Sequence, residues 1–159
     1  MKLPTVTTTV TGVLALTLVL LVAANVLVRL RNDQHEEGQA ARVVAQHAAT
    51  GFFSLSHEDP GGDVDAVLAM STGSFKKEYA AKRSQIVDSV TKNKLTVKAQ
   101  VPADGAALEY LSETAAQVLV AVDVSSKSAK ESSDAQYRTR VKLKKRDDTW
   151  LVSGLEQVG

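Results

Sequence analysis

The side chains best suited to acid–base chemistry in this sequence are Asp123, Tyr110 and Tyr137, which fall in stretches of strand character. Asp123 lies in phase with Gln117 and Leu119 near the end of such a stretch, where a carboxylate reaches water. Acid–base catalysis needs a second titratable group in an opposed environment, and the second half of the chain contains no histidine. We therefore expect no enzymatic activity and no catalytic residue.

The three histidines and the absence of cysteine limit the metal and nucleophile chemistry that is possible. His35 and His47 are twelve residues apart, about 120° around a helix, so one face cannot present both to a metal ion. The run His35-Glu36-Glu37 lacks the second histidine of a zinc-protease helix. Without cysteine, a disulfide, a thiolate zinc site, an iron–sulfur cluster and a cysteine nucleophile are excluded. No serine has the context of a nucleophile elbow, and we expect no metal and no cofactor.

Residues 71–76, Ser-Thr-Gly-Ser-Phe-Lys, look like a fragment of a phosphate-binding loop. A loop of that kind needs two glycines followed by Lys and Ser or Thr, so that backbone N–H groups surround the anion. Gly73 stands alone, and no strand pattern precedes it. Gly73 fits the left-handed position that ends a helix, and Ser74 fits the N-cap of the next helix. We predict a corner between two helices here.

Apolar residues recur at helical spacing through the first half of the chain. The first stripe after the N-terminal segment consists of Ala40, Val43, Val44, His47 and Ala48, with Gly38 as a weak point in that helix. A cluster of helix-breaking residues at 57–62 ends it, and Asp63 is the expected N-cap of a short second helix. A third helix is expected from Phe75 to about Lys94.

Strand character replaces helical spacing over residues 95–101, 107–111, 115–126, 136–145 and 149–158. Segment 115–126 is apolar on both faces, which favours a central strand. In the segment 136–145, apolar residues alternate with basic ones, so one face of the strand is apolar and the other is basic and exposed to solvent. The pattern predicts an α+β fold in which about three helices pack against a curved antiparallel sheet of about four strands.

The N-terminal segment has the composition of a membrane anchor. No ionisable side chain occurs between Lys2 and Arg29, and residues 10–28 form an apolar run that spans about 28 Å as a helix. A cleaved signal peptide is the alternative, because small residues occur at 22–24, but the apolar run continues past them. We predict an anchor over 1–30, a linker helix over 31–56 and an α+β domain over 57–159. The flanking charges lean only slightly towards a cytoplasmic domain.

Two sets of residues are candidates for protein contacts. In the anchor, small and polar side chains suit helix–helix packing, and Asn25 is the strongest because an amide in hydrocarbon gains from a partner; lipid-facing positions are the alternative. In the domain, a basic row on the wet strand face suits an acidic protein surface or anionic headgroups, or is merely solvated. The two sets are Gly12, Ala15, Thr17 and Asn25, and Arg138, Arg140, Lys142 and Lys144. Nineteen basic and eighteen acidic residues, without a long basic run, argue against nucleic acid.

A series of motifs runs along almost the whole chain. It comprises S-T-G-x-F-K-K-x-Y at 71–79, Asn-Lys at 93–94, A-x-V-L-V-A-V-D at 116–123, Y-R-x-R-V-K-L at 137–143 and W-L-V-S-x-L-E at 150–156. In this order the motifs resemble the mammalian-cell-entry (Mce)-associated membrane proteins of actinobacteria. The resemblance implies a cystatin-like or nuclear-transport-factor-like domain outside the cytoplasmic membrane, on a single-pass anchor whose N-terminus is cytoplasmic.

The same resemblance implies a non-catalytic accessory or stabilising subunit of an Mce-type importer of lipids or sterols. Its partners would be the permease, the substrate-tube subunits and membrane lipids, with no nucleic acid and no metal. Two alternatives remain: a self-assembling single-pass scaffold similar to type IV secretion subunits, and a carrier that holds a small ligand between helices and sheet. An interior filled by Phe52, Phe53, Phe75 and Trp150 would exclude the carrier.

Overall fold

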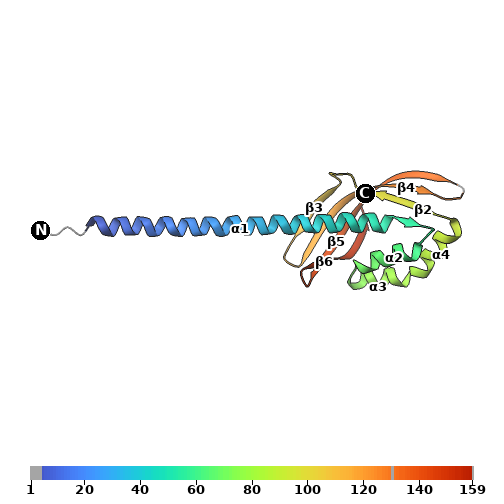
Figure 1. Ribbon diagram of the computed structural model, residues 1–159, viewed down its shortest axis with the longest axis horizontal. Coiled ribbons are helices and arrows are strands. Elements are labelled where there is room, and N and C mark those ends of the chain that lie inside the picture. The colour runs from blue at the N-terminus through green and yellow to red at the C-terminus, as the bar shows by residue number, and fades with distance from the viewer. Residues whose placement is uncertain (1–4, 130, 159) are drawn as a thin grey trace. The chain divides into compact units, whose positions relative to one another are not determined.

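The structure is a computed structural model that describes the backbone of residues 5–129 and 131–158; side chains are described at 21–24, 26–29, 34–129 and 131–158. The chain divides into two compact units, residues 1–37 and residues 38–159. The helix α1 (Thr5–Phe53) begins in the first unit and ends in the second (Figure 1). Among the side chains described, no helical stretch has the length and apolar character of a membrane span. Residues 1–20, 25 and 30 of the predicted anchor lie outside them.

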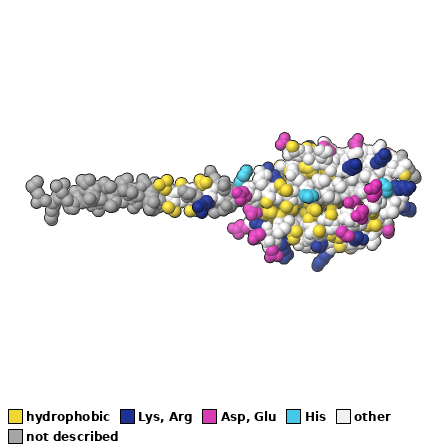
Figure 2. All heavy atoms as spheres, in the orientation of Figure 1, with side chains coloured by type: hydrophobic (Ala, Val, Ile, Leu, Met, Phe, Trp, Pro, Cys, Tyr) yellow, Lys and Arg dark blue, Asp and Glu magenta, His cyan; other side chains and the backbone are white. Residues whose placement is uncertain are grey.

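The last part of α1 forms one wall of the core of the second unit. The side chains of Ala41, Ala45, Ala48 and Ala49 are buried, and their small size lets the helix backbone approach the sheet closely. The predicted stripe was therefore wrong in phase, because Val43 is 60% exposed. Figure 2 shows apolar side chains on the domain face that α1 crosses.

Gly38 does not interrupt α1. Its Cα is buried, and a Cβ at this position would lie 3.1 Å from Cδ2 of Leu108. The glycine therefore accommodates a close approach of the strand that carries Leu108, and the expected weak point is a packing position.

Three short helices follow, α2 (Pro60–Ala69), α3 (Gly73–Ala81) and α4 (Arg83–Asn93). The N-cap of α2 is Asp59, whose side chain accepts a hydrogen bond of 3.0 Å from the Gly62 N–H. The prediction of Asp63 was wrong, because Pro60 suits the first turn and starts the helix earlier. The predicted single helix from residue 75 to 94 is broken at Lys82, whose N–H bonds to the Tyr79 carbonyl three residues back.

The segment 71–76 is a corner between α2 and α3, as predicted, but its construction differs. Gly73 has a φ of +67°, in the left-handed region, and it opens α3 instead of ending α2. Thr72, not Ser74, occupies the N-cap position. Before it the chain is extended: the Thr72 N–H donates to the Val152 carbonyl at 2.7 Å, and the Val152 N–H donates to the Met70 carbonyl at 2.8 Å. This bridge ties the helices to the last strand.

The described strands are β1 (Leu55–Ser56), β2 (Thr96–Gln100), β3 (Ala106–Leu111), β4 (Ala115–Lys127), β5 (Ser132–Arg146) and β6 (Thr149–Gln157). They form one antiparallel sheet in the order β1-β2-β4-β5-β6. The sheet has six strands instead of about four. Because β4 is thirteen residues long, β2 and β3 fit one after the other along the same edge of it.

One face of the sheet packs against α1. The even-numbered residues of β4, from Ala116 to Val124, are all buried on this face. The β4–β5 register places Leu143, Val141 and Thr139 beside them, and all three are buried. The four aromatic residues named as the test of the carrier alternative belong to the core clusters. Trp150 is buried in the core, Phe53 and Phe75 pack against it, and Phe52 packs against the adjoining cluster of α2 and α3.

Candidate interaction face

The other side of the sheet, here called the outer face, carries the remaining side chains of β4 and β5. The strand register places them in neighbouring rows, and the two core clusters include none of them. The outer face consists of Gln117, Leu119, Ala121, Asp123 and Ser125 from β4, and Asp134, Gln136, Arg138, Arg140, Lys142 and Lys144 from β5. All of these side chains are exposed or half-buried, so they are available for contacts.

The predicted basic row lies on the outer face, but two of its four charges are paired. Arg140 donates from Nε and Nη2 to the carboxylate of Glu109 on β3, at 2.5 and 3.0 Å. Lys142 donates to the carboxylate of Glu156 on β6. Arg138 and Lys144 have no ion pair within the described part of the chain. The face is therefore of mixed sign and not uniformly positive.

The Arg140–Glu109 pair crosses the width of the central strand. Arg140 lies beside Leu119 of β4, and Leu119 lies beside Ala107 of β3, so the ion pair joins β5 to β3 across β4. Its hydrogen bond and its charge lower the pKa of Glu109, and the carboxylate raises the pKa of Arg140. Both groups meet water, so the pair orders the surface more than it stabilises the fold.

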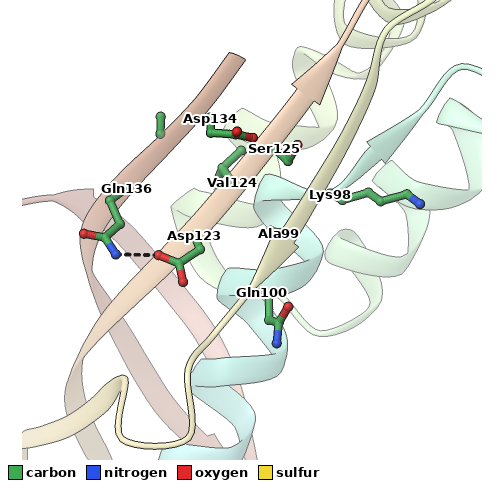
Figure 3. Close-up of a pocket in the computed structure, with 9 residues that line it drawn as sticks. Lys98, Ala99, Gln100, Asp123, Val124, Ser125, Asp134 and Gln136 are labelled. Atoms are coloured by element: carbon green, nitrogen blue, oxygen red, sulfur yellow. Dashed lines mark hydrogen bonds between the residues drawn. The ribbon is translucent and has the colours of Figure 1, made fainter. Parts of the chain in front are cut away.

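A groove of about 760 Å³ lies at one end of the outer face, where β2, β4 and β5 run side by side (Figure 3). Its polar lining comes from Lys98, Gln100, Asp123, Ser125, Asp134 and Gln136. The Gln136 amide donates to Oδ1 of Asp123 at 2.7 Å, which links β5 to β4.

The structure does not bring the three acid–base candidates together. Asp123 lies on the outer face, as its phase predicted, whereas Tyr137 lies on the core face and stacks on Phe53 with 5.3 Å between ring centroids. Tyr110 lies beside Gln117 and is 51% exposed. Tyr110 therefore lies six positions from Asp123 along β4, and Tyr137 lies on the opposite face of the sheet.

The histidines are likewise dispersed. Nδ1 of His57 lies 2.9 Å from Oγ1 of Thr96, and His35 and His47 are exposed. Over the residues that the structure describes, no three His, Cys, Asp or Glu side chains are grouped to hold a metal ion.

The anchor candidates Gly12, Ala15, Thr17 and Asn25 lie outside the described side chains, and their roles stay predictions. The acidic partners of the basic row, Glu109 on β3 and Glu156 on β6, were missed by sequence reasoning. The charge alternation of β5 indicates a basic row, but nothing in it indicates which carboxylates the register of β3 and β6 brings alongside.

A family model described as "Uncharacterized protein Rv1363c/MT1408-like" matches residues 3–159 of the sequence. The chain belongs to this family. No curated protein matches it significantly. The link to Mce-associated proteins therefore stays a prediction from the motif series.

Solved structures share the fold of the domain at low sequence identity. The periplasmic domain of DotI superposes with a TM-score of 0.62 and 18% identity, over 76% of this chain and 94% of that chain. An IcmL-like type IV secretion system protein from Legionella pneumophila gives 0.60 and 15%, over 74% and 88%. An Ntf2-like protein involved in plasmid conjugation gives 0.51 and 16%, over 75% and 48%. The likeness confirms an α+β fold of the nuclear-transport-factor-like type.

Proposed function

We propose that the chain is a non-catalytic scaffold subunit of a cell-envelope assembly. Its N-terminal segment would anchor it in the cytoplasmic membrane, and its α+β domain would lie outside that membrane and contact other proteins. The apolar composition of residues 10–28 supports the anchor. The fold shared with the periplasmic domain of DotI and with the IcmL-like secretion protein supports the location of the domain.

The observation that carries the proposal is the packed core between α1 and the strands β4 and β5. Val118, Val120 and Val122 are fully buried there, and Leu143 is 1% exposed. Phe53 stacks on Tyr137 at the margin of the same core. A carrier or an enzyme of this fold needs that space for its ligand, whereas a scaffold needs only its outer surfaces. The packed core therefore argues against the small-ligand carrier.

A second candidate is the accessory role in an Mce-type lipid or sterol importer, which the motif series favours. Both candidates have the anchor and the non-catalytic domain, and they differ in their partners. In the importer, the partners would be the permease, the substrate-tube subunits and membrane lipids. In the scaffold, they would be other subunits of a secretion-like complex and further copies of the chain.

Purification of the tagged full-length chain from native membranes, followed by mass spectrometry, tests both candidates. We expect integral-membrane partners at fixed ratios. Permease and ATPase subunits of an importer would favour the second candidate, and other envelope proteins or multiple copies of the chain would favour the first. Recovery of the chain alone, in the soluble fraction, would refute both.

A further inference from the structure

The edges of the sheet differ in how they are covered. At β6, the bridge between Ser71 and Val152 covers the middle of the strand. At β2, β1 pairs with the first residues, and the hydroxyl of Ser54 accepts from the Ala99 N–H at 3.2 Å. At β3, the register shifts between Leu108 and Tyr110. Such coverings and bulges protect edges from pairing with another chain.

The first part of β5 has none of these protections. β6 pairs with β5 only from Thr139 onwards, so β5 extends past the end of β6. Residues 132–136 are all exposed, and no described strand pairs with their free edge. The stretch 132–137, Ser-Ser-Asp-Ala-Gln-Tyr, contains no proline and no lysine, and its pairing with β4 is regular. It is an open template for strand addition.

The hydrogen bonds at the end of β6 show which backbone groups point to this edge. The Val158 N–H donates to the Arg138 carbonyl at 2.8 Å, so the polar groups of Arg138 point towards the β6 side. Because a strand alternates, the N–H and C=O groups of Gln136, Asp134 and Ser132 point the same way. They are the donors and acceptors that an added strand would use.

We propose that this edge pairs with the same edge of a second copy of the chain, antiparallel across a two-fold axis at Ala135. The inference rests on the proposed scaffold function and names one of its partners. Figure 3 shows Asp134 and Gln136 on the same strand at this margin of the groove. The pairing would join two sheets into one continuous sheet.

The sequence of the edge selects the register. With Ala135 on the axis, Asp134 lies opposite the partner's Gln136, and Gln136 lies opposite the partner's Asp134. These two pairs allow about four backbone hydrogen bonds. It also allows two carboxylate–amide contacts of the kind that Asp123 and Gln136 already form at 2.7 Å. An axis at Asp134 would place two carboxylates opposite each other, which is unfavourable. An axis at Gln136 would need the Arg138 carbonyl, which Val158 already occupies.

The pairing is short, and this determines where it operates. A ladder of this length buries less surface than the roughly 1,200 Å² of a stable interface between free proteins. Confinement in a membrane raises the effective concentration of the second copy. We therefore expect pairing in the membrane and weak self-association of the detergent-dispersed chain.

Cysteine cross-linking in native membranes tests the proposal, because the full chain has no cysteine of its own. At a non-hydrogen-bonded pair on the axis, the two Cα atoms are about 4.5 Å apart, within disulfide range. We expect the full-length Ala135→Cys variant to form a disulfide-linked homodimer under mild oxidation. The matched control is Ala107→Cys, an exposed alanine on β3 of the same sheet, and we expect about tenfold less dimer from it.

A second variant separates pairing from folding. Asp134→Pro, added to Ala135→Cys, removes an N–H that points to the free edge and leaves the β4–β5 ladder intact. We expect it to lower the cross-linked fraction about tenfold, since a proline cannot donate to the added strand.

Three results would overturn the inference: no dimer from Ala135→Cys in membranes, equal dimer from Ala107→Cys, or an adduct whose mass shows a different protein at this edge. Each leaves the scaffold function standing if the wild-type chain still co-purifies with membrane partners. Loss of those partners would instead refute the proposed function.

Discussion

Two adjacent residues of β5, Leu143 and Lys144, test whether one face of the sheet is packed in the core and the other is exposed. Leu143 is 1% exposed on the core face, and Lys144 is exposed on the outer face without an ion pair among the described residues. Leu143→Ala removes about three buried carbon groups at about 0.8 kcal/mol each and leaves a cavity, so we expect a loss of about 3 kcal/mol. Lys144→Ala should change the free energy of unfolding by less than about 0.5 kcal/mol.

The single tryptophan provides the assay. Trp150 is 5% exposed and belongs to the same core, so its fluorescence reports unfolding of this unit. With a urea slope of about 1.5 kcal/mol per M, a loss of 3 kcal/mol lowers the midpoint by about 2 M. We would measure the full-length variants in the same mild detergent. A midpoint shift for Leu143→Ala no larger than that for Lys144→Ala would refute the packing argument.

Three further predictions use the same reasoning. Arg140→Gln should raise the pKa of Glu109 towards its ordinary value, measured by NMR titration of the carboxyl carbon; an unchanged pKa would show that the pair does not form. Because that pKa is lowered in the folded chain, the pair supports stability above the ordinary glutamate pKa and loses this effect as the pH falls through the lowered value. Gly73→Ala should cost about 1 kcal/mol by urea unfolding, since φ is +67° there and no atom lies near the added Cβ; no loss would contradict the left-handed geometry. Asp59→Ala should cost about 1 kcal/mol through the lost cap, and no measurable loss would contradict the assignment of the cap.

Alternation along the strands was predictable because it is a local property. Thr139, Val141 and Leu143 are buried as the pattern of β5 indicated, and Asp123 lies on the outer face. The phase of α1 was not predictable from its composition. Alanine and valine occur all around that helix, so small side chains such as Ala45 face the core only because the sheet comes close to them.

For the candidate interaction face as well, the sequence indicates one part of the arrangement and the fold decides the other. The sequence shows a basic row, and the fold decides that Arg140 and Lys142 are neutralised while Arg138 and Lys144 are not. That outcome depends on the register of β3 and β6, which are separated from each other by the whole of β4 and β5. The roles of Gly12 and Asn25 in an anchor stay predictions.

By itself the sequence determined the α+β class, the two faces of β5 and the absence of cysteine chemistry, because each follows from composition or from short-range periodicity. The family follows from the match of the whole sequence to the family model. Only the tertiary structure decided that the core between α1, β4 and β5 is packed and that β5 runs past the end of β6. Those properties depend on which distant segments meet and where each strand stops. Hydrogen bonds and packing between segments far apart in the chain set both, and no local pattern records them.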